Sequence, residues 1–317
     1  MRYGLPYQGS KNAIAEKLVS VLPCADNFYD LFAGGCAITH RAMIDGRWKN
    51  YYANDIDNIP TLFFDAVNGK YKDEKRWISR EDFARLKDAD LYVSLCWSFG
   101  YNRKAYLYSK EIEPWRKALH YARVFNDLSL LKNIGIDSDG SYKDIKNHKD
   151  LYKQKYIEWY KQTFEQSIES LGRLQSLQSI ESLGRLQSLQ SLESLGRLQS
   201  LESMKGLESL ESLQISQKSY DEVEIKPNSV IYCDIPYENT MGYKSGDFDF
   251  KKFYDWASNQ TELVFISSYH ISDDRFVEVD GWNKTMLFSL TNATGIERLF
   301  VPKGQQKRCP ITLLDLL

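Results

Sequence analysis

The chain has 317 residues, 43% of them hydrophobic and 14% aromatic, which is enough for the core of one large domain or two ordinary ones. Its formal net charge of −2 argues against a simple electrostatic nucleic-acid binder, although a local basic face would be hidden in the sum. Five cysteines without a CxxC pair disfavour a disulfide framework and a structural zinc site. No apolar stretch approaches the roughly 20 residues of a membrane span, so we expect a soluble, intracellular protein.

The first 70 residues alternate helical and extended patterns. Residues 12–22 have apolar side chains at helical spacing, and residues 27–32 are typical of a short strand. The glycine turn at 33–35 leads into a predicted helix over 37–44, and a second predicted strand over 50–55 ends in an acid. Strand, glycine turn, helix and strand in this order predict the start of a doubly wound α/β sheet.

The segment from 71 to about 165 is rich in charged and aromatic residues. Residues 101–161 contain 13 Lys and Arg against 8 Asp and Glu, a local excess of positive charge. The stretch CWSFGYNRKAYLYSK, residues 96–110, interleaves aromatic and basic side chains. Two interpretations remain open: a solvated surface with ordinary core aromatics, or a face that contacts nucleic acid.

Residues 168–213 form a repeat. The unit ESLGRLQSLQSI at 169–180 recurs almost unchanged at 181–192 and in shortened form at 193–201, and every third residue over the whole stretch is Leu, Ile or Met. A period of three matches neither the 3.6 residues of an α-helix nor the two of a strand. The segment could be an α-helical hairpin, a 3₁₀-like or other triplet-repeat rod, or a disordered insert, and its apolar content favours ordered helix.

From about residue 222 the chain returns to α/β patterning. Residues 229–234 and 262–269 are predicted strands, with a predicted helix over 248–260 between them. Residues 285–290 and 297–303 are predicted to form a final antiparallel pair. The two outer thirds therefore read as one domain that the middle of the chain interrupts.

Two strand ends in the first third suit an adenosine-containing ligand. Gly34 and Gly35 let the backbone turn sharply after the first strand and approach a nucleotide-like molecule closely. An acid at the end of the second strand can accept hydrogen bonds from ribose hydroxyls, and Asp55 is better placed for this than Asp57. No phosphate-binding motif follows, which favours a ligand without a pyrophosphate, although a tight structural turn explains the glycines equally well.

The strand at 229–234 ends in Asp-Ile-Pro-Tyr. Ligands of open α/β sheets bind beyond the carboxyl ends of the strands, where Asp234 and the main-chain carbonyl of Ile235 can accept hydrogen bonds from an exocyclic amine. Pro236 stiffens the turn, and Tyr237 offers a face on which a planar base can stack. These residues together predict a site that holds an amino group on an aromatic ring.

Four segments in this order resemble motifs of the Dam-like (D12 class) DNA adenine-N6 methyltransferases, which use S-adenosylmethionine. YQGSKNAIAEKL is similar to the N-terminal cofactor motif, with Tyr7 and Lys11 at its aromatic and lysine positions. DLFAGGCAIT resembles the FxGxG loop through Phe32 and Gly34, and ANDID resembles the acidic strand end through Asp55.

The fourth motif is YCDIPY, which resembles the catalytic DPPY motif through Asp234, Pro236 and Tyr237. Two residues depart from the family pattern. Cys36 stands where the second glycine of the loop is usual, which puts the turn geometry in question, and Ile235 replaces the first proline. The family uses the main-chain carbonyl of that residue, and isoleucine retains it.

The resemblance implies a role for each matching residue. The catalytic residues would be Asp234, Ile235, Pro236 and Tyr237. The cofactor-binding residues would be Tyr7, Lys11, Asp30, Phe32, Gly34, Asp55, Ile56 and Asp234. The DNA-binding residues would be Tyr101, Asn102, Arg103 and Lys104. No metal is implied.

The fold implied is a class I S-adenosylmethionine-dependent methyltransferase (Rossmann-like) α/β sheet. Residues 1–70 and 222–317 would form a discontinuous catalytic domain, and residues 71–221 a mostly helical target-recognition insertion. The chain would methylate adenine N6 in double-stranded DNA, in the cytoplasm of a bacterial or phage-infected cell, and self-associate through residues 168–213. The alternatives are methylation of cytosine N4 or RNA, or a catalytically weak DNA-binding relative.

Overall fold

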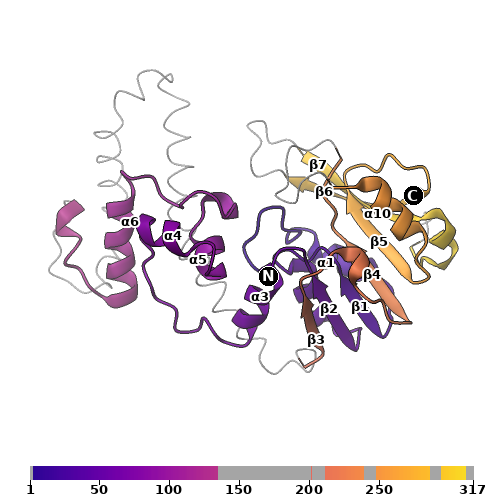
Figure 1. Ribbon diagram of the computed structural model, residues 1–317, viewed down its shortest axis with the longest axis horizontal. Helices are drawn as coiled ribbons and strands as arrows, with labels where there is room; N and C mark the ends of the chain where they lie inside the picture. Colours follow the sequence, from indigo (N-terminus) through magenta and orange to yellow (C-terminus); the bar gives the residue numbers. More distant parts are fainter. Residues whose placement is uncertain (1–2, 135–200, 202–210, 239–247, 286–293, 312–317) are drawn as a thin grey trace, which may run out of the picture. The chain divides into compact units, whose positions relative to one another are not determined.

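The computed structural model describes residues 3–134, 201, 211–238, 248–285 and 294–311 (Figure 1). The chain divides into two compact units, one made of Met1–Lys72 with Leu198–Leu317 and the other of Asp73–Arg197. Most of the leucine repeat at 168–213, and with it the predicted self-association, lies outside the described residues. Among the helices that are described, none is both long and apolar enough to cross a membrane.

The described part of the first unit is built on a seven-stranded sheet with the order β3-β2-β1-β4-β5-β7-β6 (Figure 1). The strands from β3 to β5 are parallel, and β7 and β6 complete the sheet as an antiparallel hairpin. This arrangement confirms the predicted α/β sheet and is consistent with a class I methyltransferase fold. The strands are β1 (Asn27–Asp30), β2 (Asn50–Asn54), β3 (Leu213–Ser216), β4 (Ser229–Cys233), β5 (Leu263–Ser268), β6 (Phe276–Thr285) and β7 (Thr294–Pro302).

The helices of the first unit agree with the apolar patterns of the sequence. The predicted helices over 12–22, 37–44 and 248–260 are present, and α3 follows β2 with a proline in its first turn. Short 3₁₀ segments cover Tyr220–Glu222 and Lys303–Arg308. The helices are α1 (Ala15–Val21), α2 (Ala37–Asp45), α3 (Ile59–Val67) and α10 (Phe250–Ser258).

Two strands differ from the sequence-based expectation. The strand β3 lies inside the predicted insertion over 71–221, because the leucine period runs on to Leu213 and conceals a strand that pairs with β2. The partner of β7 is β6 rather than residues 285–290, most of which lie outside the described residues. Asp280–Gly281 reads as a turn, but in the structure these residues follow a register shift within β6.

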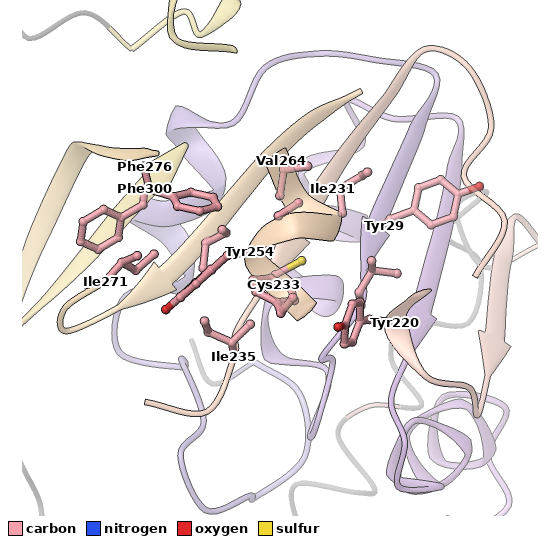
Figure 2. Close-up of a cluster of buried hydrophobic side chains, with 14 residues drawn as sticks. Tyr29, Tyr220, Ile231, Cys233, Ile235, Tyr254, Val264, Ile271, Phe276 and Phe300 are labelled. Carbon is pink, nitrogen blue, oxygen red and sulfur yellow. The ribbon is translucent and has the colours of Figure 1, made fainter. Parts of the chain in front are cut away.

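Alternate residues of the strands point to the two faces of the sheet. Tyr29, Ile231 and Val264 lie on one face with α10, in a cluster that also contains Cys233 and Ile235 (Figure 2). Residues of opposite parity, including Asp30 and Asp234, belong to the other face, since successive side chains of a strand alternate. The helices α1 and α2 pack against each other, and Thr39 of α2 donates a hydrogen bond to Asp30.

The described part of the second unit, up to residue 134, contains helices and irregular segments. Ser79 and Asp90 cap α4 and α5, each accepting a hydrogen bond from backbone amides of the first turn. Its core is aromatic, and the Trp77 ring stacks on Tyr108 and meets Trp97 edge-on. The helices are α4 (Arg80–Leu86), α5 (Leu91–Cys96) and α6 (Glu113–His120). A 3₁₀ turn over Phe99–Tyr101 lies between α5 and α6, and a π-helical turn over Tyr121–Phe125 and a 3₁₀ turn over Lys132–Ile134 follow α6.

Candidate functional site

The candidate site lies where the carboxyl ends of β1, β2 and β4 meet. The chain runs from β1 outwards to β2 and β3, and then returns to place β4 on the other side of β1. Such a reversal of strand order opens a crevice at the carboxyl edge of a parallel sheet. Asp30, at the end of β1, pairs in register with Tyr232 of the neighbouring strand β4. Asp234 comes two residues after Tyr232, directly after the end of β4.

The glycine loop between β1 and α2 is tied to the end of β2. The backbone amide of Gly34 donates a hydrogen bond of 2.8 Å to Oδ2 of Asp55, and the amide of Ala33 donates to the carbonyl of Asn54. The amide of Leu5 donates to the carbonyl of Gly35 from the other side. The loop is therefore held between the second strand and the N-terminal segment.

Cys36 adopts the conformation that a glycine would have at its position. Its φ of 57° and ψ of 34° are left-handed, and its side chain is completely buried. A left-handed non-glycine residue costs about 1–2 kcal/mol. The departure from the family pattern at Cys36 therefore leaves a turn of the glycine type in place, and burial raises the pKa of the thiol well above its usual value.

Tyr7 packs on the glycine loop. A Cβ added to Gly34 would lie 2.9 Å from Cε1 of Tyr7, and one added to Gly35 would lie 2.7 Å from its Cβ. Gly34 also has a φ of 46°, which disfavours any side chain. The tyrosine thus lies directly against the loop, and both positions need glycine.

The acids at the ends of β1 and β2 have raised pKa values. Burial raises the pKa of Asp30 to about 7, although its Oδ2 accepts a hydrogen bond of 2.7 Å from Thr39; the Asp234 carboxylate raises it further. Its Oδ1 is buried and has no hydrogen-bond donor among the described residues. Burial raises the pKa of Asp55 to about 6, against the effect of the backbone amides of Asp57 and Gly34.

Two of the predicted cofactor residues lie in different surroundings. Ile56 is 60% exposed at the end of β2, which leaves an apolar side chain available to a ligand. The ring of Phe32 instead packs with Tyr220 and Phe253 beside the cluster on the α10 face.

The ammonium of Lys11 lies at the end of β4. Its Nζ donates hydrogen bonds of 2.5 Å to Oδ1 of Asp234 and 2.7 Å to the hydroxyl of Tyr237. The ammonium is 4% exposed. Burial favours its neutral form, but the carboxylates of Asp234 and Glu297 have the larger combined effect, so the pKa of Lys11 is raised above its usual value.

Glu297 of β7 completes this group and is a residue that sequence reasoning missed. It is fully buried, accepts hydrogen bonds of 3.1 and 3.0 Å from the Tyr237 hydroxyl, and lies 3.5 Å from Nζ of Lys11. The available signal was the period of two in β7, which places Glu297 on the same face as the buried Leu299 and Val301.

The Asp-Ile-Pro-Tyr segment separates its side chains between two environments. Ile235 is buried in the cluster on the α10 face (Figure 2). Asp234 is 21% exposed, and the half-buried ring of Tyr237 lies 4.3 Å from that of Tyr269. Ile235 therefore anchors the segment in the core, and Asp234 and Tyr237 on either side of it lie at the edge of the sheet.

The predicted DNA-binding residues form a turn in the second unit. Ser98 and Tyr106 are bridged in antiparallel fashion, and the turn between them contains Asn102, whose Oδ1 accepts hydrogen bonds from the amides of Lys104 and Ala105. Lys104 is exposed. Tyr101 and Arg103 have left-handed φ values, and Nε of Arg103 donates to the Ser94 hydroxyl.

The family model for the D12 class N6 adenine-specific DNA methyltransferases matches residues 7–171, just over half of the chain. The matched range includes Tyr7, Lys11, the glycine loop and Asp55, and it ends before Asp234. No curated protein matches the chain.

Proposed function

This chain belongs to the D12 class N6 adenine-specific DNA methyltransferase family, and on that premise we propose that it transfers a methyl group from S-adenosylmethionine to N6 of an adenine in double-stranded DNA. The observation that carries the proposal is the end of β4. Asp234 has one carboxylate oxygen fixed by Lys11, while Oδ2 has no donor among the described residues. Beside it lie the main-chain carbonyl of Ile235 and the ring of Tyr237.

The end of β1 is suited to S-adenosylmethionine. The buried Oδ1 of Asp30 is an acceptor without a donor in the described part of the chain, which fits an ammonium group of the ligand. The glycine loop allows close approach, and Asp55 and the exposed Ile56 would receive the ribose and the adenine ring. When bound, S-adenosylmethionine supplies a methyl group on a positively charged sulfur.

The residues after β4 would hold the target amine. An adenine must leave the base stack to reach them, which costs a few kcal/mol. Its N6 would donate one hydrogen bond to Oδ2 of Asp234 and another to the carbonyl of Ile235, and the ring would stack on Tyr237. This orients the nitrogen lone pair, so the contribution of the chain is positioning and electrostatic stabilisation.

The negative charge of Asp234 also suits the reaction product. The methyl carbon would exchange its bond to sulfur for a bond to the nitrogen, and the sulfur would keep the electron pair of the broken bond. The nitrogen then carries a positive charge until it releases one proton to water. A carboxylate within hydrogen-bond distance of that nitrogen stabilises the charge as it develops. A neutral residue at this position would orient the amine less well and leave the charge unpaired.

We assign target recognition to the second unit and DNA contacts to Tyr101, Asn102, Arg103 and Lys104. The side chain of Asn102 holds the backbone of the turn, and Lys104 is exposed on that turn. An exposed lysine on a fixed backbone suits a contact with phosphate. Arg103 is partly buried against Ser94, which suits a role in shaping the turn. Replacement of Lys104 should weaken binding to all DNA sequences and reduce its salt dependence.

The test is transfer of tritium from labelled S-adenosylmethionine to unmethylated genomic DNA, followed by digestion to nucleosides. The proposal predicts that the label is recovered in N6-methyl-2′-deoxyadenosine. Sequencing of the same DNA would give the recognition site. Label in N4-methylcytosine, or transfer to RNA but not DNA, would replace the proposed substrate. Binding of cofactor and DNA without any transfer would identify a DNA-binding relative.

A further inference from the structure

Glu297 has no assigned role in the proposed reaction, yet it is the most deeply buried carboxylate beside Asp234. It lies on β7, which β5 separates from β4, and its side chain is fully buried. Burying an ionised carboxylate is costly unless charged or hydrogen-bonding partners surround it. Its partners include Tyr237 and Lys11, which are both close to the proposed amine site.

The network that includes Glu297 draws on separate parts of the chain. Lys11 comes from the N-terminal segment, Asp234 and Tyr237 from the turn after β4, and Glu297 from β7. Nζ of Lys11 lies 2.5 Å from Asp234 and 3.5 Å from Glu297, and the Tyr237 hydroxyl bridges Lys11 and Glu297.

The network determines which parts of the segment face a substrate. Oδ1 of Asp234 accepts from Lys11 and, at 3.3 Å, from Ser267, which fixes the plane of the carboxylate and leaves Oδ2 for an amine. The Tyr237 hydroxyl is held by Lys11 and Glu297, while its ring packs on Tyr269. Loss of Glu297 would release the hydroxyl end of the ring on which the base is proposed to stack.

Glu297 also changes the charge of the site. The Lys11 ammonium by itself would cancel the charge of Asp234, which would weaken the stabilisation of an amine that becomes positively charged. Glu297 adds a second negative charge beside the same ammonium. The group of two carboxylates and one ammonium therefore remains negative when Asp234 binds the amine.

We propose that Glu297 is a positioning residue for methyl transfer. It orients the ring of Tyr237 and offsets the positive charge of Lys11, so that the negative charge of Asp234 remains available to stabilise the amine. This inference rests on the proposed function. It assigns Glu297 a contribution to the transfer step rather than to the binding of DNA or cofactor.

The test compares Glu297→Gln with Glu278→Gln. Both residues belong to the β6–β7 hairpin, but Glu278 is exposed and its carboxylate pairs with Arg298 instead of Lys11. We expect Glu297→Gln to lower kcat about a hundredfold, the loss typical of a misplaced reacting group, with little change in KM for DNA or cofactor. Glu278→Gln should leave both constants near those of the wild-type protein. A purely structural role would instead lower the fraction of active protein and the melting temperature together, without a selective fall in kcat.

A double-mutant cycle with Lys11→Met shows whether Glu297 acts through the lysine. The thermal unfolding midpoints of the wild-type protein, both single variants and the double variant give a readout that does not need activity. We expect the double variant to be less destabilised than the sum of the single changes, because each single change removes the same contact between the Lys11 ammonium and the Glu297 carboxylate.

The outcomes separate this inference from the proposed function. A wild-type value of kcat in Glu297→Gln, or additive midpoints in the cycle, would overturn the role of Glu297. Absence of transfer by the wild-type protein would count against the proposed function, and the cycle would then decide whether the network exists. Selective loss of kcat together with non-additive midpoints would support the inference.

Discussion

The carboxyl ends of β1 and β4 are neighbours in the sheet, but their acids are stabilised in different ways. At β1, Asp30 has no ion-pair partner among the described residues, and burial raises its pKa to about 7. At β4, Asp234 forms an ion pair of 2.5 Å with the buried Lys11. Among the described residues, the end of β1 has a buried carboxyl group without a neighbouring cation, whereas the end of β4 has Lys11 paired with its carboxylate.

The difference suits the end of β1 to binding the cofactor and the end of β4 to binding the target amine. A ligand that brings positive charge is favoured at Asp30, because it supplies what the chain lacks there. S-adenosylmethionine, with its ammonium and sulfonium groups, has this property. At Asp234 the internal lysine holds the carboxylate in one orientation, which is what a neutral amine requires.

Replacing Lys11 should have the largest effect on stability. Lys11→Met removes the ammonium that pairs with Asp234 and lies beside the buried Glu297, and breaking a buried ion pair costs about 3–5 kcal/mol. Urea denaturation at neutral pH measures the change. Lys70→Met is the matched control, since Lys70 forms a 2.6 Å ion pair with Asp65 at the surface and should contribute less than about 1 kcal/mol. Equal losses in both variants would show that the network at β4 is no stronger than a surface pair.

Asp30→Asn should change the pH dependence of stability. The pKa of Asp30 is raised in the folded state, so the folded protein binds this proton more tightly, and stability falls as pH rises from about 4 to 7. Asn cannot ionise, so the variant should gain stability relative to the wild-type protein across this window. The rise of the Asp30 pKa from 3.8 to about 7 sets an upper limit of about 4 kcal/mol on this gain in the free energy of unfolding. Unfolding curves at pH 4, 6 and 8 give the difference, and a difference independent of pH would contradict the assignment.

Gly34→Ala should have a smaller effect on stability but a specific one on cofactor binding. Gly34 and Gly46 both have positive φ, and an alanine in this conformation costs about 1–2 kcal/mol at either position. Only at Gly34 would the new Cβ meet Tyr7, since Gly46 has nothing within 4 Å. Calorimetric titration with S-adenosylmethionine should show at least about tenfold weaker binding, about 1.4 kcal/mol, for Gly34→Ala alone. Equal weakening by Gly46→Ala would mean that the Tyr7 contact is not involved.

Local patterns were sufficient to predict the strands and helices on either side of the site. The β-branched and aromatic residues of β4 and the glycine turn after β1 place Asp234 and Asp30 at strand ends without any knowledge of tertiary contacts. The leucine period concealed β3, whose only distinguishing feature is its pairing with β2. A turn-like Asp-Gly pair concealed β6.

The site itself could be predicted only in part. Asp234 and Tyr237 could be proposed together because they lie in one four-residue segment of the chain. Glu297 lies 60 residues beyond Tyr237, and only the order of β5 and β7 brings it to the same place. The cofactor-binding role of Lys11 stays a prediction, and its ion pairs with Asp234 and Glu297 could not be read from the sequence, because they depend on tertiary contacts.

The most direct test of this division of labour is Asp234→Ala, with cofactor affinity and methyl transfer measured on the same preparation. We predict that S-adenosylmethionine binding measured by calorimetry changes little, while tritium transfer to DNA is abolished. Near-wild-type transfer, or a loss of cofactor affinity that accounts for the whole loss of transfer, would contradict the assignment of the amine site to the end of β4.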